Sequence, residues 1–416
     1  MKTSYLINFA SSKFKLDLHY FLRGSIWASL QQIIGVTCGL VVSFLFGHFV
    51  SKTVFGQYNL VLSVMGMLTF LSLPGIDMPL TRSISQGYDK SLFISQKLKF
   101  RLSLFGVPIL LGFALFYFIK NEFIVSQSLL VAAIAFPWLN AFSSFPAFLT
   151  AKRRFFNLAL ISSVASIFFL IIHVLAIFIS PQTVILLFAY VVAIIVPTWF
   201  GYIYSQRFVH KDSKTDPSLP AYGSFLTTLS VLPWISGNIG SVILAMYLGP
   251  ETLAVYAVAS RFLTAVQKNF VVFYKPLTAK LAAQSQHDHL STLKVHWPKL
   301  LILGLGLAGF LWVSTPILIE FFFTKSYREA VFYGQVLSLS LLPLPLSWVT
   351  SDMIIYQKRK RPQIFMSTIP HLVKIVLYFL LLPKYGIWAL IGITIGERVF
   401  EPVIPLITIL KTERKK

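Results

Sequence analysis

Charged residues, and acids above all, are scarce in this sequence. Only 12% of its 416 residues are charged, Asp and Glu together number 14, and there is a single cysteine. Because an average soluble domain carries about 25% charged residues, this composition excludes a soluble enzyme and a disordered chain. A lone cysteine excludes an intrachain disulfide. Cys38 lies within an apolar run, where we expect it to pack as a small hydrophobe.

Apolar residues are what the chain has in abundance. They make up 56% of the sequence, and the mean hydropathy is +0.75. A helix needs about 20 apolar residues to cross a bilayer, and runs of that length recur along the chain. We therefore predict an all-α integral membrane protein with about twelve transmembrane helices. The predicted spans are 26–49, 58–81, 102–119, 123–150, 156–180, 183–205, 222–247, 252–274, 299–322, 330–355, 363–382 and 386–410.

The basic residues predict how these spans are oriented. If both termini are cytoplasmic, the cytoplasmic segments hold 27 of the 36 Lys and Arg residues and the outer loops hold five. Such an excess on one side is the positive-inside pattern. The net charge of +22 is thus explained by membrane topology, and we expect the partner to be the lipid bilayer and not nucleic acid.

The two halves of the sequence resemble each other. Gly24-Ser25 opens the first span and Tyr58 follows, while Gly223-Ser224 opens the seventh span and Tyr256 follows at nearly the same spacing. Such internal repeats are typical of secondary transporters. We predict a cytoplasmic tail (1–25), a six-helix bundle (26–205), a cytoplasmic linker (206–221), a second pseudo-symmetric six-helix bundle (222–410) and a cytoplasmic tail (411–416).

The motifs of a catalytic, cofactor or metal site are missing. The sequence contains no G-x-x-x-x-G-K-[ST] loop for nucleotide phosphates and no Asp-x-Asp pair for a metal-bound sugar nucleotide. The outer loops are too short to build an active site. His287-Asp288-His289 is interpreted as part of a solvated loop because no fourth ligand is evident. We therefore predict that the protein is not an enzyme and needs no cofactor or metal.

Basic side chains inside the spans indicate a substrate-binding site. Arg261 and Lys268 are seven residues apart, so both point the same way from one helix, roughly 10 Å apart. A cationic stripe of this kind suits an anionic substrate, and phosphate is the obvious candidate. Lys374 and Arg398 are further candidates for substrate binding.

The acids inside the spans allow two interpretations. Asp77 and Glu397 are candidates for ion coupling, because intramembrane carboxylates are costly and often functional. Alternatively, these charges only pair between helices and stabilise the bundle. Arg398 and Glu401, three residues apart, are placed to form such a pair, and Arg261 would then pair with an acid such as Asp77 or Glu397.

Proline and glycine interrupt spans in both halves. Pro74-Gly75 lies in the second span, and Pro233 with Gly237 lies in the seventh. Such residues bend helices, as alternating access between two bundles requires. These four residues are our hinge candidates.

Several segments of the first half resemble bacterial polysaccharide flippases, the O-antigen and capsule repeat-unit translocases of the multidrug/oligosaccharidyl-lipid/polysaccharide (MOP) superfamily. The similar segments are Gly24-Ser25-Ile26-Trp27, Val54 to Leu60, Leu73-Pro74-Gly75-Ile76, and Arg82-Ser83 through Gly87. The detailed match covers residues 20–100, about a fifth of the chain. The twelve-span, two-lobe plan extends the resemblance over nearly all of it.

The resemblance implies a V-shaped pair of six-helix bundles in the bacterial cytoplasmic (inner) membrane. It implies export of undecaprenyl-diphosphate-linked oligosaccharide to the outer leaflet, driven by an H⁺ or Na⁺ gradient, for O-antigen, capsule or exopolysaccharide assembly. Arg261 and Lys268 match, by position, a helix that lines the cationic cavity in relatives. Other polysaccharide-assembly membrane proteins are further possible partners.

Two other functions stay open. A drug or small-cation antiporter of the same superfamily would favour an acid-lined cavity, whereas this chain has few intramembrane acids. A membrane polysaccharide polymerase or ligase would need a long outer loop bearing Arg, His or Asp, which the sequence does not contain.

Overall fold

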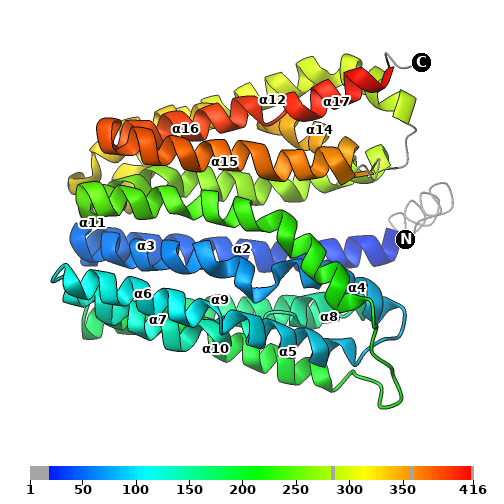
Figure 1. Cartoon of the computed structure of the whole chain (residues 1–416), viewed down its shortest axis with the longest axis horizontal. Helices are drawn as coiled ribbons and strands as arrows, with labels where there is room; N and C mark the ends of the chain where they lie inside the picture. The colour runs from blue at the N-terminus through cyan, green and yellow to red at the C-terminus, as the bar shows by residue number, and fades with distance from the viewer. Residues whose placement is uncertain (1–17, 283–285, 357–359, 414–416) are drawn as a thin grey trace, which may run out of the picture. The chain divides into compact units, whose positions relative to one another are not determined.

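The computed structural model describes residues 18–282, 286–356 and 360–413, and among these residues it contains helices and connections but no strand. The predicted tails therefore fall partly outside the described residues, at 1–17 and 414–416. The helices (Figure 1) are α2 (Leu18–Phe49), α3 (Lys52–Met67), α4 (Asp77–Ser85), α5 (Ser91–Ser103), α6 (Gly106–Ile119), α7 (Phe123–Ala141), α8 (Phe145–Ala151), α9 (Phe155–Ile179), α10 (Thr183–Gln206), α11 (Leu219–Ala282), α12 (Gln286–Phe322), α13 (Glu329–Ser338), α14 (Leu344–Tyr356), α15 (Lys360–Tyr385), α16 (Ile387–Phe400) and α17 (Val403–Glu413). Short 3₁₀ turns lie at Leu68–Ser72, Pro74–Ile76, Lys325–Tyr327 and Leu339–Leu341.

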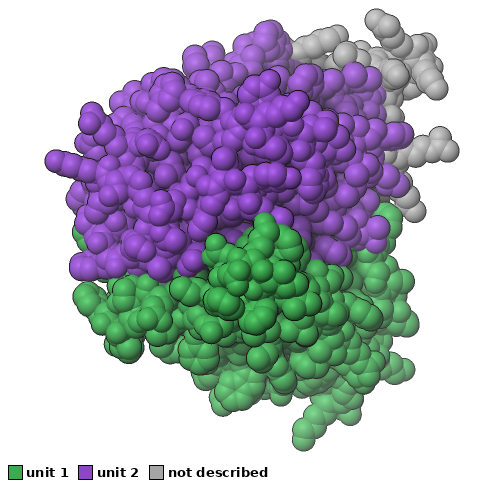
Figure 2. Space-filling view, turned by 60° about the vertical axis from the view of Figure 1, so that its left-hand side comes forward, with its two compact units in different colours: residues 1–45, 71–227 green, residues 46–70, 228–416 purple. Residues whose placement is uncertain are grey.

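The chain forms two compact units (Figure 2). Unit 1 comprises residues 1–45 and 71–227, and unit 2 comprises residues 46–70 and 228–416. Within unit 1, α6 packs along α7 and α9 along α10, and within unit 2, α15 packs along α16. Residues 46–70 therefore belong, by their contacts, with the second half of the chain. The two bundles predicted at 26–205 and 222–410 stay a prediction.

The surface and interior have the polarity expected in a lipid solvent. Large apolar side chains such as Ile134 and Ile179 are about three-quarters exposed, whereas Ser95, Ser128 and Thr350 are completely buried. Helices satisfy their own backbone hydrogen bonds and are therefore the elements that cross a bilayer. The protein is an all-α integral membrane protein, as the sequence predicts.

The structure contains fewer candidate spans than the predicted twelve, in part because two predicted spans fall within one long element. Nine helices among the described residues are long and apolar enough to cross a membrane, or ten if the bent pair Glu329–Leu341 and Leu344–Ile354 is one span. The predicted spans 222–247 and 252–274 are two helices within α11, which meet at a kink at Gly249 (φ 83°, ψ 166°). Glycine adopts this left-handed φ without a Cβ clash, so a single residue replaces the predicted loop. The last predicted span, 386–410, is divided into the shorter helices α16 and α17.

The third predicted span begins too late in the sequence. The structure extends this membrane segment over Ser91–Ile119 and not only 102–119, because α5 continues almost directly into α6. Lys99, which the sequence places in a cytoplasmic segment, lies within α5 and is 1% exposed. Its neighbours Lys97 and Arg101 made the whole stretch look like a solvated charge run.

The predicted linker 206–221 is attached to unit 1 by two aspartates. Asp89 accepts hydrogen bonds from the Lys152 ammonium (2.7 Å) and the backbone N–H of His210 (3.1 Å). The Asp216 carboxylate accepts hydrogen bonds from the hydroxyls of Ser83 and Ser218. These bonds, that from Ser83 first, lower the pKa of the Asp216 carboxyl from its usual value. The linker is therefore held at several points along unit 1.

Candidate functional site

An interruption of the helical structure between α3 and α4 positions the first polar cluster. Leu73 has a left-handed backbone (φ 55°), and Pro74–Ile76 form a single 3₁₀ turn before α4 begins at Asp77. The backbone N–H of Gly75 donates to the Thr227 hydroxyl (3.1 Å) at the start of α11. A Cβ at position 75 would lie 2.5 Å from the Thr227 nitrogen, so the close approach of these two segments requires glycine.

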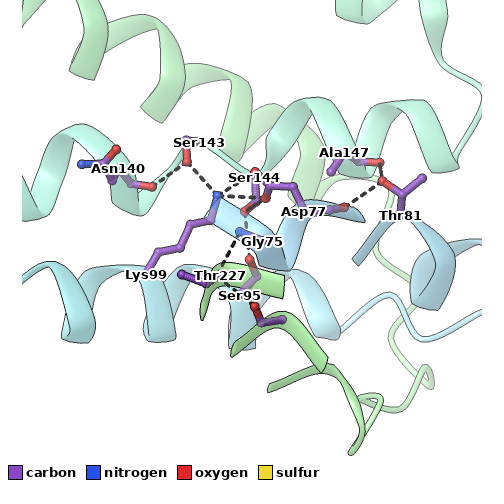
Figure 3. Close-up of polar contacts among 11 residues, drawn as sticks. Gly75, Asp77, Thr81, Ser95, Lys99, Asn140, Ser143, Ser144, Ala147 and Thr227 are labelled. Carbon is purple, nitrogen blue, oxygen red and sulfur yellow. Dashed lines mark hydrogen bonds and ion pairs between the residues drawn. The ribbon is translucent and has the colours of Figure 1, made fainter. Parts of the chain in front are cut away.

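Asp77 is the centre of a buried polar cluster in unit 1 (Figure 3). The Lys99 ammonium donates to both carboxylate oxygens of Asp77, at 2.8 and 2.9 Å, and to the Ser143 hydroxyl at 2.9 Å. The Ser144 hydroxyl, between α7 and α8, also donates to Asp77 (2.7 Å) and lies 2.8 Å from the hydroxyl of Ser95. The Lys99 side chain is 2% exposed and that of Asp77 is 37% exposed. The carboxylate is thus a partly accessible acid whose charge balances a buried cation.

Reasoning from the sequence identified Asp77 but missed Lys99. A usable signal was the four-residue spacing of the buried polar residues on α5, which places them on one helix face. These polar residues are Ser91, Ser95, Lys99 and Ser103. A lysine within a ladder of serines on one face indicates a buried polar stripe and not a solvated charge run.

A pocket in unit 2 is lined by five of the candidate hinge, substrate-binding and ion-coupling residues. It has a volume of about 210 Å³ and lies between α11, α14, α15, α16 and α17. The hinge candidates Pro233 and Gly237 line it together with the charged candidates Lys374, Glu397 and Arg398. The structure thus brings residues more than 160 positions apart in the sequence into one site.

Glu397 on α16 forms ionic contacts with two side chains of α15 in this pocket. The Lys374 ammonium donates to Glu397 Oε2 at 2.6 Å, and both side chains are nearly buried. Nδ1 of His371 lies 3.4 Å from Glu397 Oε1 and 2.8 Å from the hydroxyl of Ser236 on α11. Ser236 lies between the hinge candidates in sequence. His371 therefore links Glu397 to the part of α11 that contains Pro233 and Gly237.

Arg398 completes the pocket. Its Nη1 donates to Glu401 at 2.8 Å, which confirms the predicted i,i+3 pair. Its Nε is buried and has no hydrogen-bond partner among the described residues. A guanidinium offers five donors in a rigid fork, and the Nε–H is one donor of Arg398 that the described structure leaves without an acceptor.

Arg261 and Lys268 lie elsewhere on α11. Both side chains are exposed, and their seven-residue spacing on a continuous helix places them on one face, as predicted. Asp77 and Glu397, the acids considered as partners for Arg261, are bound by Lys99 and Lys374. The structure therefore pairs neither Asp77 nor Glu397 with Arg261.

The described part of the chain contains no group of three or more His, Cys, Asp or Glu side chains that could hold a metal ion. The polar clusters each combine one or two acids with lysine or arginine. In these clusters the carboxylates of Asp77, Glu397 and Glu401 are paired with Lys99, Lys374 and Arg398.

We expect Gly75→Ala to destabilise unit 1 by about 1–3 kcal/mol, the usual range for forced overpacking. The added methyl group would collide with the backbone of residues 226 and 227 and displace the start of α11. The midpoint of thermal unfolding in detergent measures the effect. Gly112→Ala is the matched control, because a Cβ at Gly112 meets no atom within 4 Å. Equal midpoints for the two variants would contradict the close approach at position 75.

Comparison with solved structures shows the fold. A MOP-superfamily transporter from Pyrococcus furiosus superposes with a TM-score of 0.63 at 14% identity, covering 94% of this chain and 95% of that one. The MATE transporter VcmN from Vibrio cholerae gives 0.60 at 15% identity, covering 96% and 97%. The lipid II flippase MurJ, in an inward closed conformation, gives 0.60 at 15% identity, covering 93% and 87%. A search of curated protein sequences found no significant match.

The sequence also matches a family model. The family is described as polysaccharide biosynthesis protein, and the match covers residues 21–277, more than half of the chain. This confirms and extends the resemblance found over residues 20–100. With the helices, the intramembrane charges and the fold of MOP-superfamily transporters established, the chain belongs to the polysaccharide biosynthesis protein family.

Proposed function

We propose that this protein is a flippase for lipid-linked oligosaccharides. It moves undecaprenyl-diphosphate-linked repeat units from the inner to the outer leaflet of the bacterial cytoplasmic membrane, for O-antigen, capsule or exopolysaccharide assembly. The observation that carries the proposal is the pocket of unit 2, in which cationic side chains lie beside Pro233 and Gly237 of α11 in a membrane protein of the polysaccharide biosynthesis family.

Two groups of cationic side chains bind the anionic part of the proposed substrate. Arg261 and Lys268 are exposed on one face of α11, and Lys374 and Arg398 line the pocket of unit 2. A diphosphate is costly to transfer into a low-dielectric site unless it is paired with cations. Arginine in particular offers two parallel donors to phosphate oxygens. These four residues are the proposed substrate-binding residues.

Asp77 and Glu397 are the proposed ion-coupling residues. Each carboxylate is already bound by a buried lysine, so H⁺ or Na⁺ would have to compete with an ammonium group for the same oxygens. At Glu397 that competition also involves His371, which contacts Ser236 on α11. Loading an ion there would weaken the Lys374 bond and free this lysine for an anionic substrate.

The hinge candidates support movement between two access states. The chain passes from one unit to the other at positions 45/46, 70/71 and 227/228. Pro74 and Gly75 follow the second junction closely, and Pro233 and Gly237 follow the third. Proline and glycine next to such junctions permit bending without loss of the flanking helices.

The direct test is a strain in which the gene is deleted. We expect lipid-linked repeat units to accumulate in the inner leaflet of the cytoplasmic membrane and the surface polysaccharide to disappear, with both effects reversed by the intact gene. Normal surface polysaccharide together with new sensitivity to cationic drugs would instead support the antiporter. Loss of polymer length with repeat units still reaching the outer leaflet would support a polymerase.

A further inference from the structure

Two arginines of unit 1 are held over neighbouring aromatic rings. Cζ of Arg154 lies 4.5 Å from the centre of the Phe208 ring, and Cζ of Arg207 lies 5.8 Å from the centre of the Tyr204 ring. Both distances are within the range of cation–π contacts. The two rings meet edge to face, with their centres 5.3 Å apart. Packing therefore brings two exposed cations from distant parts of the sequence to one place.

No acid in the described part of unit 1 pairs with these two arginines. The ion pairs of this unit are formed by Lys99 and Lys152. Asp212 of the linker is exposed, and no ion pair joins it to Arg154 or Arg207 among the described residues. Two like charges held near each other repel, and an anion beside them lowers that repulsion. The pair thus favours a negatively charged ligand.

The start of α9 adds to the positive charge of this place. Arg154 directly precedes the helix, no side chain caps this end, and the first turn contains no acid. The side-chain amide of Asn157 in this turn donates to the Tyr204 hydroxyl, so the turn lies beside the ring that Arg207 contacts. The first N–H groups of a helix have no acceptor within the helix and attract anions. They suit a phosphate group in particular.

Exposed apolar side chains lead along both helices from this place. On α10, Trp199 and Ile203 precede Arg207 at steps of four residues, so the three share one helix face. Trp199 is 51% exposed and Ile203 is 38% exposed, and on α9 Phe156 and Leu160 are exposed to a similar extent. In a membrane protein such side chains contact hydrocarbon. The ligand that matches both parts is an amphipathic lipid with a phosphate headgroup.

We propose that Arg154 and Arg207 bind the headgroup of an anionic phospholipid whose acyl chains lie against α9 and α10. Both arginines are in segments predicted to be cytoplasmic, so the lipid belongs to the inner leaflet. The positive-inside pattern explains why arginines occur here, but it requires neither the aromatic support nor the meeting of two guanidinium groups. The site lies within unit 1 and does not depend on which molecule the protein transports.

The strength of the site favours an abundant membrane lipid over a scarce one. A basic residue at an anionic membrane surface strengthens binding about fivefold. Two arginines on an open surface therefore give weak binding, which a bulk lipid of the leaflet saturates by its concentration. Guanidinium groups also offer parallel donors to the two free oxygens of a phosphodiester.

The test uses the full-length protein in phosphatidylcholine nanodiscs that contain a little photoreactive phosphatidylglycerol. We expect labelling of residues 154–160 and 199–208, displaced by unlabelled phosphatidylglycerol and weakened by high salt. Arg154→Gln and Arg207→Gln should each reduce the labelling about fivefold. Arg101→Gln is the matched control, because Arg101 is an exposed arginine of the same unit on α5, and its labelling should equal that of the unchanged protein.

Arg154→Lys and Arg207→Lys keep the charge and should retain more labelling than the glutamine variants. The lipid preference of the unchanged protein is measured without any substitution, so it tests the proposal even if a variant misfolds. Equal labelling of Arg207→Gln and Arg101→Gln, or equal displacement by phosphatidylcholine, would overturn the proposal. Displacement by polyprenyl diphosphate far below the effective concentration of phosphatidylglycerol would assign the site to the transported lipid and would also overturn it.

Discussion

Arg261→Ala should reduce export about ten- to hundredfold while the protein stays in the membrane at normal abundance. A hydrogen bond to a charged group contributes about 1.5–3 kcal/mol, and each 1.4 kcal/mol is a factor of ten. Arg261 is exposed on α11, and surface substitutions usually change stability by no more than about 0.5 kcal/mol. Complementation of a deletion strain measures export, and immunoblotting of membranes measures abundance.

Two further variants separate substrate binding from a structural role of Arg261. Arg261→Lys should recover only part of the activity, because an ammonium cannot offer a planar pair of donors to phosphate oxygens. Lys268→Ala should be milder than Arg261→Ala. A protein that vanishes from the membrane in Arg261→Ala and returns when a nearby acid is also changed would show that Arg261 is a packing residue. Unchanged export would end its assignment to the substrate.

Asp77→Ala should destabilise unit 1 by about 3–5 kcal/mol, the typical cost of leaving one member of a buried ion pair without its partner. The Lys99 ammonium, 2% exposed, would lose both Asp77 oxygens and keep its hydrogen bond to the Ser143 hydroxyl. Replacing both members, as in Asp77→Ala with Lys99→Met, should restore most of the stability because no charge is then buried. The unfolding midpoint in detergent measures both variants.

Asp212→Ala is the control for this prediction, because Asp212 is an exposed acid of the same unit and surface changes usually stay within about 0.5 kcal/mol. We expect this double variant to fold although it lacks the Asp77 carboxylate. It therefore also tests whether that carboxylate takes part in ion coupling. We expect its export to lose part of its dependence on the ion gradient. A stable single Asp77→Ala variant would contradict the ion pair seen in the structure.

The sequence was sufficient to predict the fold class because hydropathy alone decides it. Runs of apolar residues require helices in a bilayer, and the described structure contains helices throughout. The exact spans were harder to predict. Gly249 turns the chain within a single residue, and α5 continues the third span across a stretch of basic residues. Local hydropathy does not show either feature, because both depend on which side chains the helix partners bury.

The candidate site was predicted residue by residue but not as an arrangement. Lys374, Glu397 and Arg398 stood out because charges inside apolar spans are rare. Their meeting with Pro233 and Gly237 in one pocket depends on how α11 packs against α15 and α16, which a single sequence does not encode locally. Lys99 was missed for the opposite reason: its charged neighbours in sequence concealed that its own helix face is buried.

The most direct measurement is translocation by the purified protein in proteoliposomes. A fluorescent undecaprenyl-diphosphate oligosaccharide is placed in one leaflet, and its arrival in the other is followed with a membrane-impermeant sugar-cleaving enzyme, with and without an H⁺ or Na⁺ gradient. We expect transfer that depends on the protein and is accelerated by the gradient. We also expect Arg261→Ala to reduce transfer about ten- to hundredfold, as in cells. Transfer no faster than in protein-free vesicles under either gradient would contradict the proposed flippase function.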